Sequence, residues 1–110
     1  MSMAATHGEN HHSERVLAAI AHEAATFIHQ EAGTDSLITV MRAAYLSRGE
    51  RVAVFVSVYP EEKMRSALAF LERQREAFSD HLKTHTRLGA LPRVEFLLDN
   101  GEHLGEPAKS

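Results

Sequence analysis

The sequence predicts an α+β domain in which a three-stranded sheet is covered on one face by helices. Three observations predict this fold class: a strongly alternating strand at residues 51–59, a strand-like segment before it at residues 37–46, and two long stretches with helical spacing of apolar residues. The expected order is helix, strand, strand, helix, strand. Helices gathered on one side of a small sheet bury the apolar faces of both kinds of element.

The length of the chain suits one compact domain. It has 110 residues, of which 44% are hydrophobic and 25% charged, and such a chain buries about 60–70% of its unfolded surface. The absence of cysteine excludes disulfides, thiolate zinc sites and thiol nucleophiles. No apolar run approaches the roughly 20 residues of a membrane-spanning helix, and the first residues lack the order of a signal peptide. We therefore expect a cytoplasmic protein.

A helix is expected over about residues 14–32. Ser13 can cap its start, apolar residues recur at helical spacing from Val16 to Ile28, and Gly33 tolerates the left-handed conformation that ends many helices. Residues 1–12 are small, polar and rich in histidine, so they are expected to form a flexible arm.

A hairpin is expected next. Residues 37–46 are apolar and include the strand-favouring Thr39 and Val40, and residues 47–50 form a turn in which Gly49 can take a positive φ. The second strand, at residues 51–59, has four valines on one face, and small and aromatic residues on the other. This strand is expected at the centre of the sheet.

Strand is expected to become helix at Pro60 with almost no loop. Proline suits the first helical position because its missing N–H has no helical partner there, and Glu61 and Glu62 lie where the helix dipole favours negative charge. Apolar spacing then continues, but Gln74 and Arg75 interrupt it. The segment is therefore either one long helix with a polar interruption or two helices that meet near residues 74–79.

The end of the domain is marked by turn residues and a short strand. Gly89 and Pro92 end the helical region, and residues 94–99 are expected to form the third strand. The domain should span residues 13–101, followed by a flexible tail at 102–110. The expected core consists of Val16, Ile20, Phe27, Ile28, Val40, Val54, Val56, Leu68, Leu71, Phe78, Leu82, Val94 and Phe96.

The charges are unevenly distributed along the chain. The formal net charge is −3, yet acidic residues dominate both ends and most of the lysines and arginines lie between residues 37 and 93. A local basic face can contact phosphates even in an acidic protein, because charges within a Debye length act most strongly. The simpler interpretation of the same charges is a solvated helix surface.

Several short segments, in this order, resemble the bacterial ribosome-binding factor A family. They are Arg15-Val16, Asp35-Ser36-Leu37, Leu46-Ser47-Arg48, Val54 to Val58, Thr86-Arg87-Leu88, Leu91-Pro92 and Phe96 to Asn100. The most characteristic run is an Arg-Leu, then a Pro opening the third strand, then a Phe and an Asp closing it. The similarity extends from about Ser13 to Gly101.

The resemblance implies a type II KH-like fold and a non-catalytic assembly factor. Such a factor binds the small ribosomal subunit and its rRNA during late maturation and rRNA processing. In that family the helix is interrupted by Ala-x-Gly, and the corresponding positions here are Gln74, Arg75 and Glu76. KH-like folds clamp nucleic acid at the turn between two helices, and without glycine a close approach of backbone to phosphate is harder. Side chains would then have to make the phosphate contacts.

Six cations are the candidate RNA-binding residues: Arg48 and Arg51 at the hairpin end, and Arg73, Arg75, Lys83 and Arg87 along the helical region. Phosphate contacts of this kind give affinity that falls steeply with salt and little sequence preference. The alternative for the helical cations is pairing with Glu72 and Glu76 at three-residue spacing. Phe55 and Tyr59 either stack bases on an open sheet face or pack as part of the sheet surface.

Eight histidines raise the question of a metal site. His81 and His85 share one helix face, and His22 and His29 are two turns apart, but a zinc site needs three or four convergent ligands. There is no HExxH motif, phosphate loop or nucleophile elbow, and Ser57 lies within a strand, so neither a metal nor catalysis is expected.

The expected partners are the small ribosomal subunit and its rRNA. We expect no cofactor, no membrane association, no small-molecule substrate and a monomeric state. The alternative function is a diverged KH-like protein-interaction module without strong RNA binding. The missing Ala-x-Gly and the acidic ends of the chain favour that alternative over an enzyme.

Overall fold

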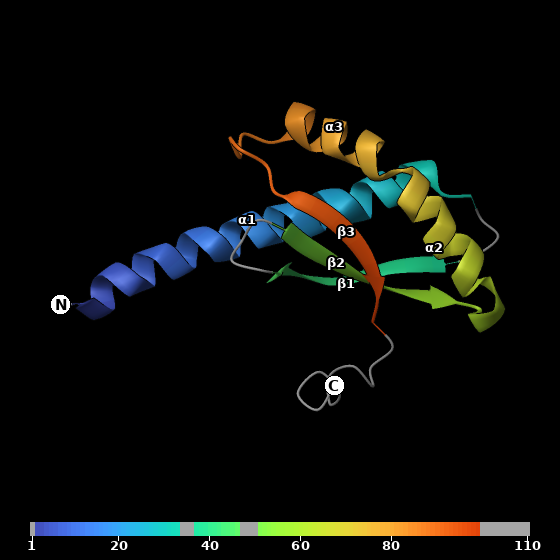
Figure 1. Cartoon of the computed structure of the whole chain (residues 1–110), viewed down its shortest axis with the longest axis horizontal. Helices are drawn as coiled ribbons and strands as arrows, with labels where there is room; N and C mark the ends of the chain where they lie inside the picture. The colour runs from blue at the N-terminus through green and yellow to red at the C-terminus, as the bar shows by residue number, and fades with distance from the viewer. Residues whose placement is uncertain (1, 34–36, 47–50, 100–110) are drawn as a thin grey trace.

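The computed structural model describes the backbone of residues 2–33, 37–46 and 51–99, and side chains from residue 13 onward. The elements, coloured along the chain in Figure 1, are α1 (Ser2–Glu31), β1 (Leu37–Leu46), β2 (Arg51–Tyr59), the 3-10 turn η2 (Glu61–Lys63), α2 (Met64–Arg73), α3 (Arg75–His85) and β3 (Arg93–Leu98). This order confirms the predicted fold class, a KH-like α+β domain.

The sheet has the order β1-β2-β3, which confirms that the valine-rich strand is central. β1 and β2 are antiparallel, with Val40 opposite Val56, and β2 and β3 are parallel, with Val54 opposite Phe96. A register shift between Val40 and Arg42 interrupts the first ladder. The hairpin is therefore confirmed, while its turn at residues 47–50 lies outside the described part of the chain.

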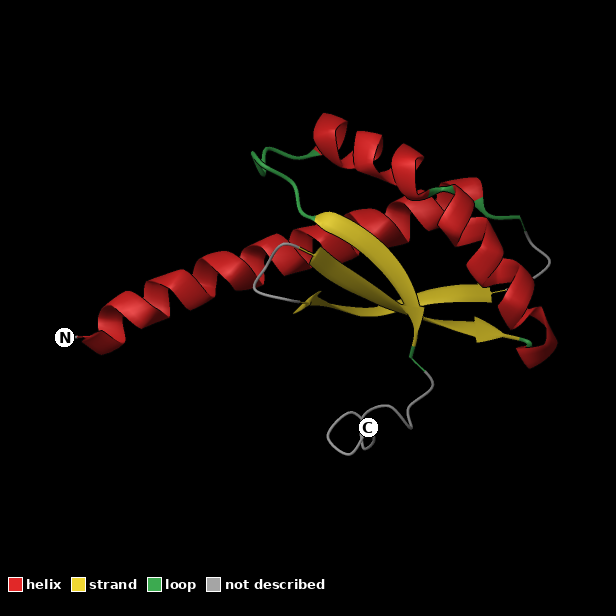
Figure 2. Cartoon of the chain, in the orientation of Figure 1, coloured by secondary structure: helices red, strands yellow, loops and turns green. Residues whose placement is uncertain are grey.

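One face of the sheet carries the core. Figure 2 shows the three helices gathered along one side of the strands. Phe78 of α3 packs in the middle, with its ring centroid 5.3 Å from that of Phe27 in α1 and 5.7 Å from that of Phe96 in β3. The fully buried residues of this core are Ile20, Ala24, Val52, Val54, Val56, Leu71, Phe78 and Leu82. Every residue of the predicted core belongs to the core cluster or packs against it.

The first helix begins earlier than predicted. It starts at Ser2, not near residue 14, so Ser13 lies inside it and does not cap its start. Residues 2–12 contain helix formers such as alanine and glutamate and no proline, and a helix continues through such a segment even without an apolar stripe. Figure 1 shows these first turns extending beyond the edge of the sheet. That residues 1–12 form a flexible arm and that the domain spans 13–101 stay predictions, and the tail at 102–110 lies outside the described residues.

The start of the second helical region also differs from the prediction. Pro60 does not occupy the first helical position; its backbone is extended, with φ −77° and ψ 164°, and it precedes η2. Its carbonyl accepts a hydrogen bond from the Lys63 amide at 2.9 Å. The strand therefore ends in a single 3-10 turn before α2 begins at Met64.

The polar interruption divides the helical region in two. Gln74 separates α2 from α3 with φ −94° and ψ 4°, a sparsely populated region of backbone space. Its amide is shared between the carbonyls of Phe70 and Leu71, at 3.1 and 3.0 Å, and its own carbonyl accepts the amide of Phe78 at 2.8 Å. The structure therefore confirms one of the two alternatives from the sequence, namely two helices that meet near residues 74–79.

Candidate nucleic-acid interface

The break between α2 and α3 places two arginines side by side in the chain. Arg73 is the last residue of α2 and Arg75 the first of α3. Gln74 makes no side-chain capping hydrogen bond to α3, and the first N–H groups of a helix have no intrahelical acceptor. We call this region, residues 72–76, the kink. It combines cationic side chains with the positive end of a helix dipole.

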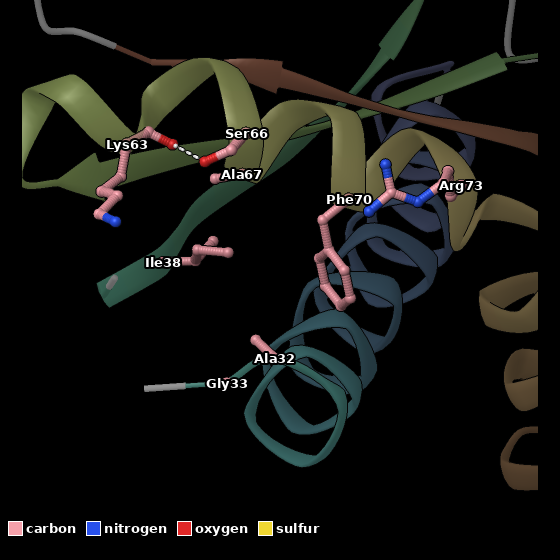
Figure 3. Close-up of a pocket in the computed structure, with 8 residues that line it drawn as sticks. All are labelled: Ala32, Gly33, Ile38, Lys63, Ser66, Ala67, Phe70 and Arg73. Carbon is pink, nitrogen blue, oxygen red and sulfur yellow. Dashed lines mark hydrogen bonds between the residues drawn. The ribbon is translucent and has the colours of Figure 1, made fainter. Parts of the chain in front are cut away.

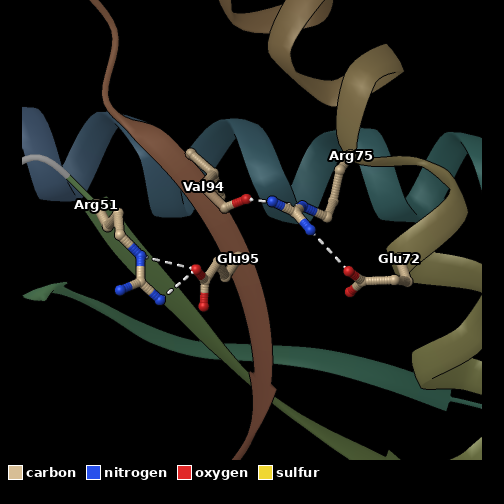
Figure 4. Close-up of polar contacts among 5 residues, drawn as sticks. All are labelled: Arg51, Glu72, Arg75, Val94 and Glu95. Atoms are coloured by element: carbon tan, nitrogen blue, oxygen red, sulfur yellow. Dashed lines mark hydrogen bonds and ion pairs between the residues drawn. The ribbon is translucent and has the colours of Figure 1, made fainter.

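Arg75 joins the kink to the third strand. Its Nε donates a hydrogen bond to the carbonyl of Val94 at 3.3 Å, and its Nη1 donates to Oε2 of Glu72 at 2.7 Å, as Figure 4 shows. The pairing with Glu72 is the three-residue helix pair that the sequence offered as the alternative to RNA contact. Arg75 is thus engaged by both β3 and Glu72, and its contact with rRNA stays a prediction.

Arg73 is exposed and forms no ion pair with any other described residue. It lines a hollow of about 490 Å³, which we call the kink groove. The groove is lined by Glu72, Arg73, Arg75, Glu76, Ser79, Pro92, Arg93 and Val94. Three arginines outnumber two glutamates along it, so the groove has an excess of positive charge.

Arg93 is the groove residue that sequence reasoning missed. It opens β3 directly after Pro92 and is exposed. In the parallel ladder it pairs with Arg51, which begins β2. The position of Arg93 could have been predicted from the sequence. Pro92 opens the third strand, so a cation directly after it must lie at the start of that strand.

Arg51 is near β3 but is already paired. Its Nε and Nη2 both donate to Oε2 of Glu95, at 2.8 and 2.5 Å. Figure 4 shows this pair on the opposite side of β3 from Arg75. A carboxylate that takes two hydrogen bonds from one guanidinium reduces the charge that remains for a phosphate.

The other predicted RNA contacts lie apart from the kink. Lys83 is near the far end of α3, about 12 Å along the helix from Arg75, and its Nζ is 4.0 Å from Oδ1 of Asp80. Arg87 is exposed and follows the end of α3. Arg48 lies outside the described residues. The structure therefore brings Arg73 and Arg75 together, adds Arg93, and separates them from Lys83 and Arg87.

His81 connects α3 to α1, and His85 packs on His81 within α3. Nε2 of His81 lies 2.8 Å from Oε1 of Glu23 on α1, and the His81 side chain is only 9% exposed. The His85 ring stacks on that of His81 with centroids 4.0 Å apart, and its Nδ1 lies 2.9 Å from the His81 carbonyl. In the described part of the chain, no group of three or more histidine, aspartate or glutamate side chains is placed to hold a metal ion.

The second face of the sheet carries no helix. Leu37, Met41, Tyr59 and Leu97 are 64%, 52%, 73% and 38% exposed on the strands. Phe55 on the same face is partly covered by Arg42, whose guanidinium carbon lies 4.0 Å from the ring centroid. Of the two aromatic residues considered for base stacking, Tyr59 is exposed and Phe55 is partly covered. No helix in the described residues is long and apolar enough to cross a bilayer.

Comparison with solved structures finds a protein of similar fold. A scan against protein-family models finds none that fits the chain, and a search of curated proteins finds no match either. Among solved structures, the crystal structure of ribosome-binding factor A from Thermus thermophilus matches with a TM-score of 0.66 and 27% sequence identity. The match covers 76% of this chain and 92% of that one. The chain therefore has a ribosome-binding-factor-A-like fold.

Proposed function

We propose that this chain, with its ribosome-binding-factor-A-like fold, is a non-catalytic assembly factor that binds the small ribosomal subunit. The observation that carries the proposal is the structural match, which extends over 92% of the Thermus protein at 27% identity. Action during late maturation and rRNA processing, in the cytoplasm and as a monomer, is the role that we propose with it.

The kink groove is the surface that we propose for rRNA. Arg73 and Arg93 are exposed along it, and the uncapped start of α3 adds backbone N–H groups. Phosphate oxygens favour such a combination of cations and helix N-terminus. Glu72 and Glu76 in the same groove limit the net positive charge, so we expect moderate affinity.

The absence of glycine at the kink changes how phosphate is held. Gln74 has a negative φ, so the break needs no glycine, but its side chain stands where the family has a small residue. Contact would therefore be made chiefly by the arginine side chains rather than by close backbone approach.

The salt dependence of binding tests this surface. We predict that affinity for purified small subunits falls steeply between about 50 and 200 mM salt, because each phosphate contact releases counterions. Exchanging Arg73 and Arg93 for glutamate should weaken binding at low salt and reduce the slope of log affinity against log salt by roughly one per lost phosphate contact. Fluorescence anisotropy of labelled protein measures both quantities.

A charge-matched control separates the groove from general electrostatics. Arg15 on α1 and Arg65 on α2 are exposed and do not line the kink groove, so the Arg15→Glu/Arg65→Glu variant changes the net charge equally. It should bind nearly as the wild type does. Equal loss in both double variants would assign the effect to net charge and remove the groove from the proposal.

A protein-interaction module is the second candidate function. The observation that favours it is the sheet face without a helix, on which the paired residues Leu37 and Tyr59 and also Leu97 are exposed, because exposed apolar surface can mark protein contacts. Binding to subunits that resists salt but is lost on a Tyr59→Lys/Leu97→Lys exchange would favour this function over rRNA binding.

A further inference from the structure

A second hollow lies on another face of α2. It has a volume of about 250 Å³ and is lined by Ala32, Gly33, Ile38, Lys63, Ser66, Ala67, Phe70 and Arg73. Figure 3 shows it between the end of α1, the start of β1 and one face of α2. The α2 residues follow the three- and four-residue spacing of one helix face, so we call it the α2 pocket. It shares only Arg73 with the kink groove.

The floor of the α2 pocket is apolar and contains an aromatic ring. Ala67 is buried, and Phe70 and Ile38 are half-buried. Figure 3 shows the Phe70 ring pointing toward Ala32 at the end of α1. A ring that is partly open to solvent beside small apolar residues offers a flat surface on which another ring can stack.

The rim of the α2 pocket is cationic. Lys63 and Arg73 stand at the two ends of α2, about 15 Å apart along the helix, and neither forms an ion pair with a described residue. None of the described residues that line the pocket is acidic. The kink groove contains two glutamates, and so does a third hollow beside Met64 and Leu98. Among the described lining residues of these three hollows, those of the α2 pocket have the largest excess of positive charge.

The negative end of the α1 dipole lies beside the pocket, which Ala32 and Gly33 line. The Ala32 amide donates to the Ile28 carbonyl at 2.8 Å, and the last carbonyls of a helix receive no hydrogen bond from within the helix itself. These carbonyls lie at the negative end of the helix dipole, which disfavours phosphate and favours N–H donors. An occupant should therefore turn its donors toward α1 and its negative charge toward Lys63 and Arg73.

We propose that the α2 pocket holds one unstacked base of single-stranded RNA. The base stacks on Phe70 with its amino or imino edge toward the end of α1, and the adjoining phosphates contact Lys63 and Arg73. Aromatic stacking flanked by cations is the usual chemistry of single-strand recognition. The inference rests on the proposed function and deepens it, since Arg73 connects the kink groove to the α2 pocket.

Titration of isotope-labelled protein with three RNA probes tests the pocket. The probes are a mixed-sequence single strand, the same sequence as a duplex, and the same backbone without bases at successive positions. We expect the single strand to shift the NMR signals of the Gly33 amide and the Ile38 and Ala67 methyl groups. The duplex and the abasic strand should leave these signals nearly unchanged, because neither presents a free base.

Variants of the pocket measure the contribution of stacking. Phe70→Leu keeps an apolar side chain but removes the ring, and it should weaken single-strand binding by roughly 5- to 100-fold, the range that stacking of one base supplies. Its affinity for the abasic strand should not change. Lys63→Gln should weaken binding of both the intact and the abasic strand. Arg65 is an exposed cation of α2 outside the pocket, so Arg65→Gln should leave both affinities nearly unchanged. Unchanged melting temperatures and NMR dispersion establish that each variant folds.

The outcomes separate this inference from the proposed function. If small subunits bind through the kink groove but Phe70→Leu has wild-type affinity for the single strand, the pocket inference is wrong and the proposed function stands. If the single strand shifts the pocket signals while subunits do not bind, the proposed function is wrong and the pocket remains an RNA site. Failure of every RNA probe to shift the pocket signals, or equal shifts with the duplex and the abasic strand, would overturn the inference.

Discussion

At the scale of single residues, the structure divides the predicted cations by what each already contacts. Arg75 and Arg51 are engaged by neighbouring groups, whereas Arg73 and Arg93 are free along the kink groove in the described chain. Sequence spacing predicted that Arg75 could pair with Glu72, but it gave no indication of the hydrogen bond to Val94, nineteen residues away. Long-range contacts of this kind depend on how the helix packs against the strand.

Arg75 should therefore matter more for stability than for RNA binding. We predict that Arg75→Ala lowers the free energy of unfolding by about 1–2 kcal/mol, because it removes the hydrogen bonds to Val94 and Glu72. Arg73 is exposed and lies two positions away, so Arg73→Ala should change the free energy of unfolding by no more than about 0.5 kcal/mol. Urea denaturation of both variants measures the difference, and equal stabilities would contradict the positioning role of Arg75.

At the scale of elements, periodicity predicted the strands better than the first helix. β1 and β2 have the predicted bounds, because alternation and β-branched residues mark them clearly. The break at Gln74 was visible as a polar residue where the helical pattern required an apolar one. The start of α1 was missed, because residues 2–12 have no apolar stripe; they contain no proline, so the backbone can continue the helix that follows.

The central strand should be the element least tolerant of change. Val56 is completely buried between β1, β3 and the helices, so Val56→Asp would place an unpaired carboxylate in the core. That substitution costs several kcal/mol against a total stability of about 5–15 kcal/mol, and we predict loss of the folded state. Circular dichroism during heating measures whether the variant still has a cooperative unfolding transition.

Thr39→Asp is the control for that substitution. Thr39 is exposed on β1 opposite Ser57, so the same carboxylate stays in water and the protein should melt cooperatively. A soluble Val56→Asp variant with a cooperative transition would contradict the assignment of Val56 to the core.

At the scale of the whole molecule, the sequence predicted the fold more readily than the place of the candidate binding surface. The sequence showed that most lysines and arginines lie between residues 37 and 93, but the kink groove becomes visible only when α2, α3 and the start of β3 are brought together. The α2 pocket likewise combines residues from α1, β1 and α2 that are far apart in the chain. Such surfaces follow from tertiary packing, which local patterns do not encode.

Co-sedimentation with ribosomal particles tests the central claim most directly. Wild-type protein is mixed with immature small subunits, mature small subunits or large subunits at low and moderate salt, and each mixture is centrifuged through a sucrose cushion. We predict that the protein pellets with small subunits, in a salt-sensitive manner, and stays in the supernatant with large subunits. Absence from both small-subunit pellets at low salt would contradict the assembly-factor function, while leaving the fold assignment intact.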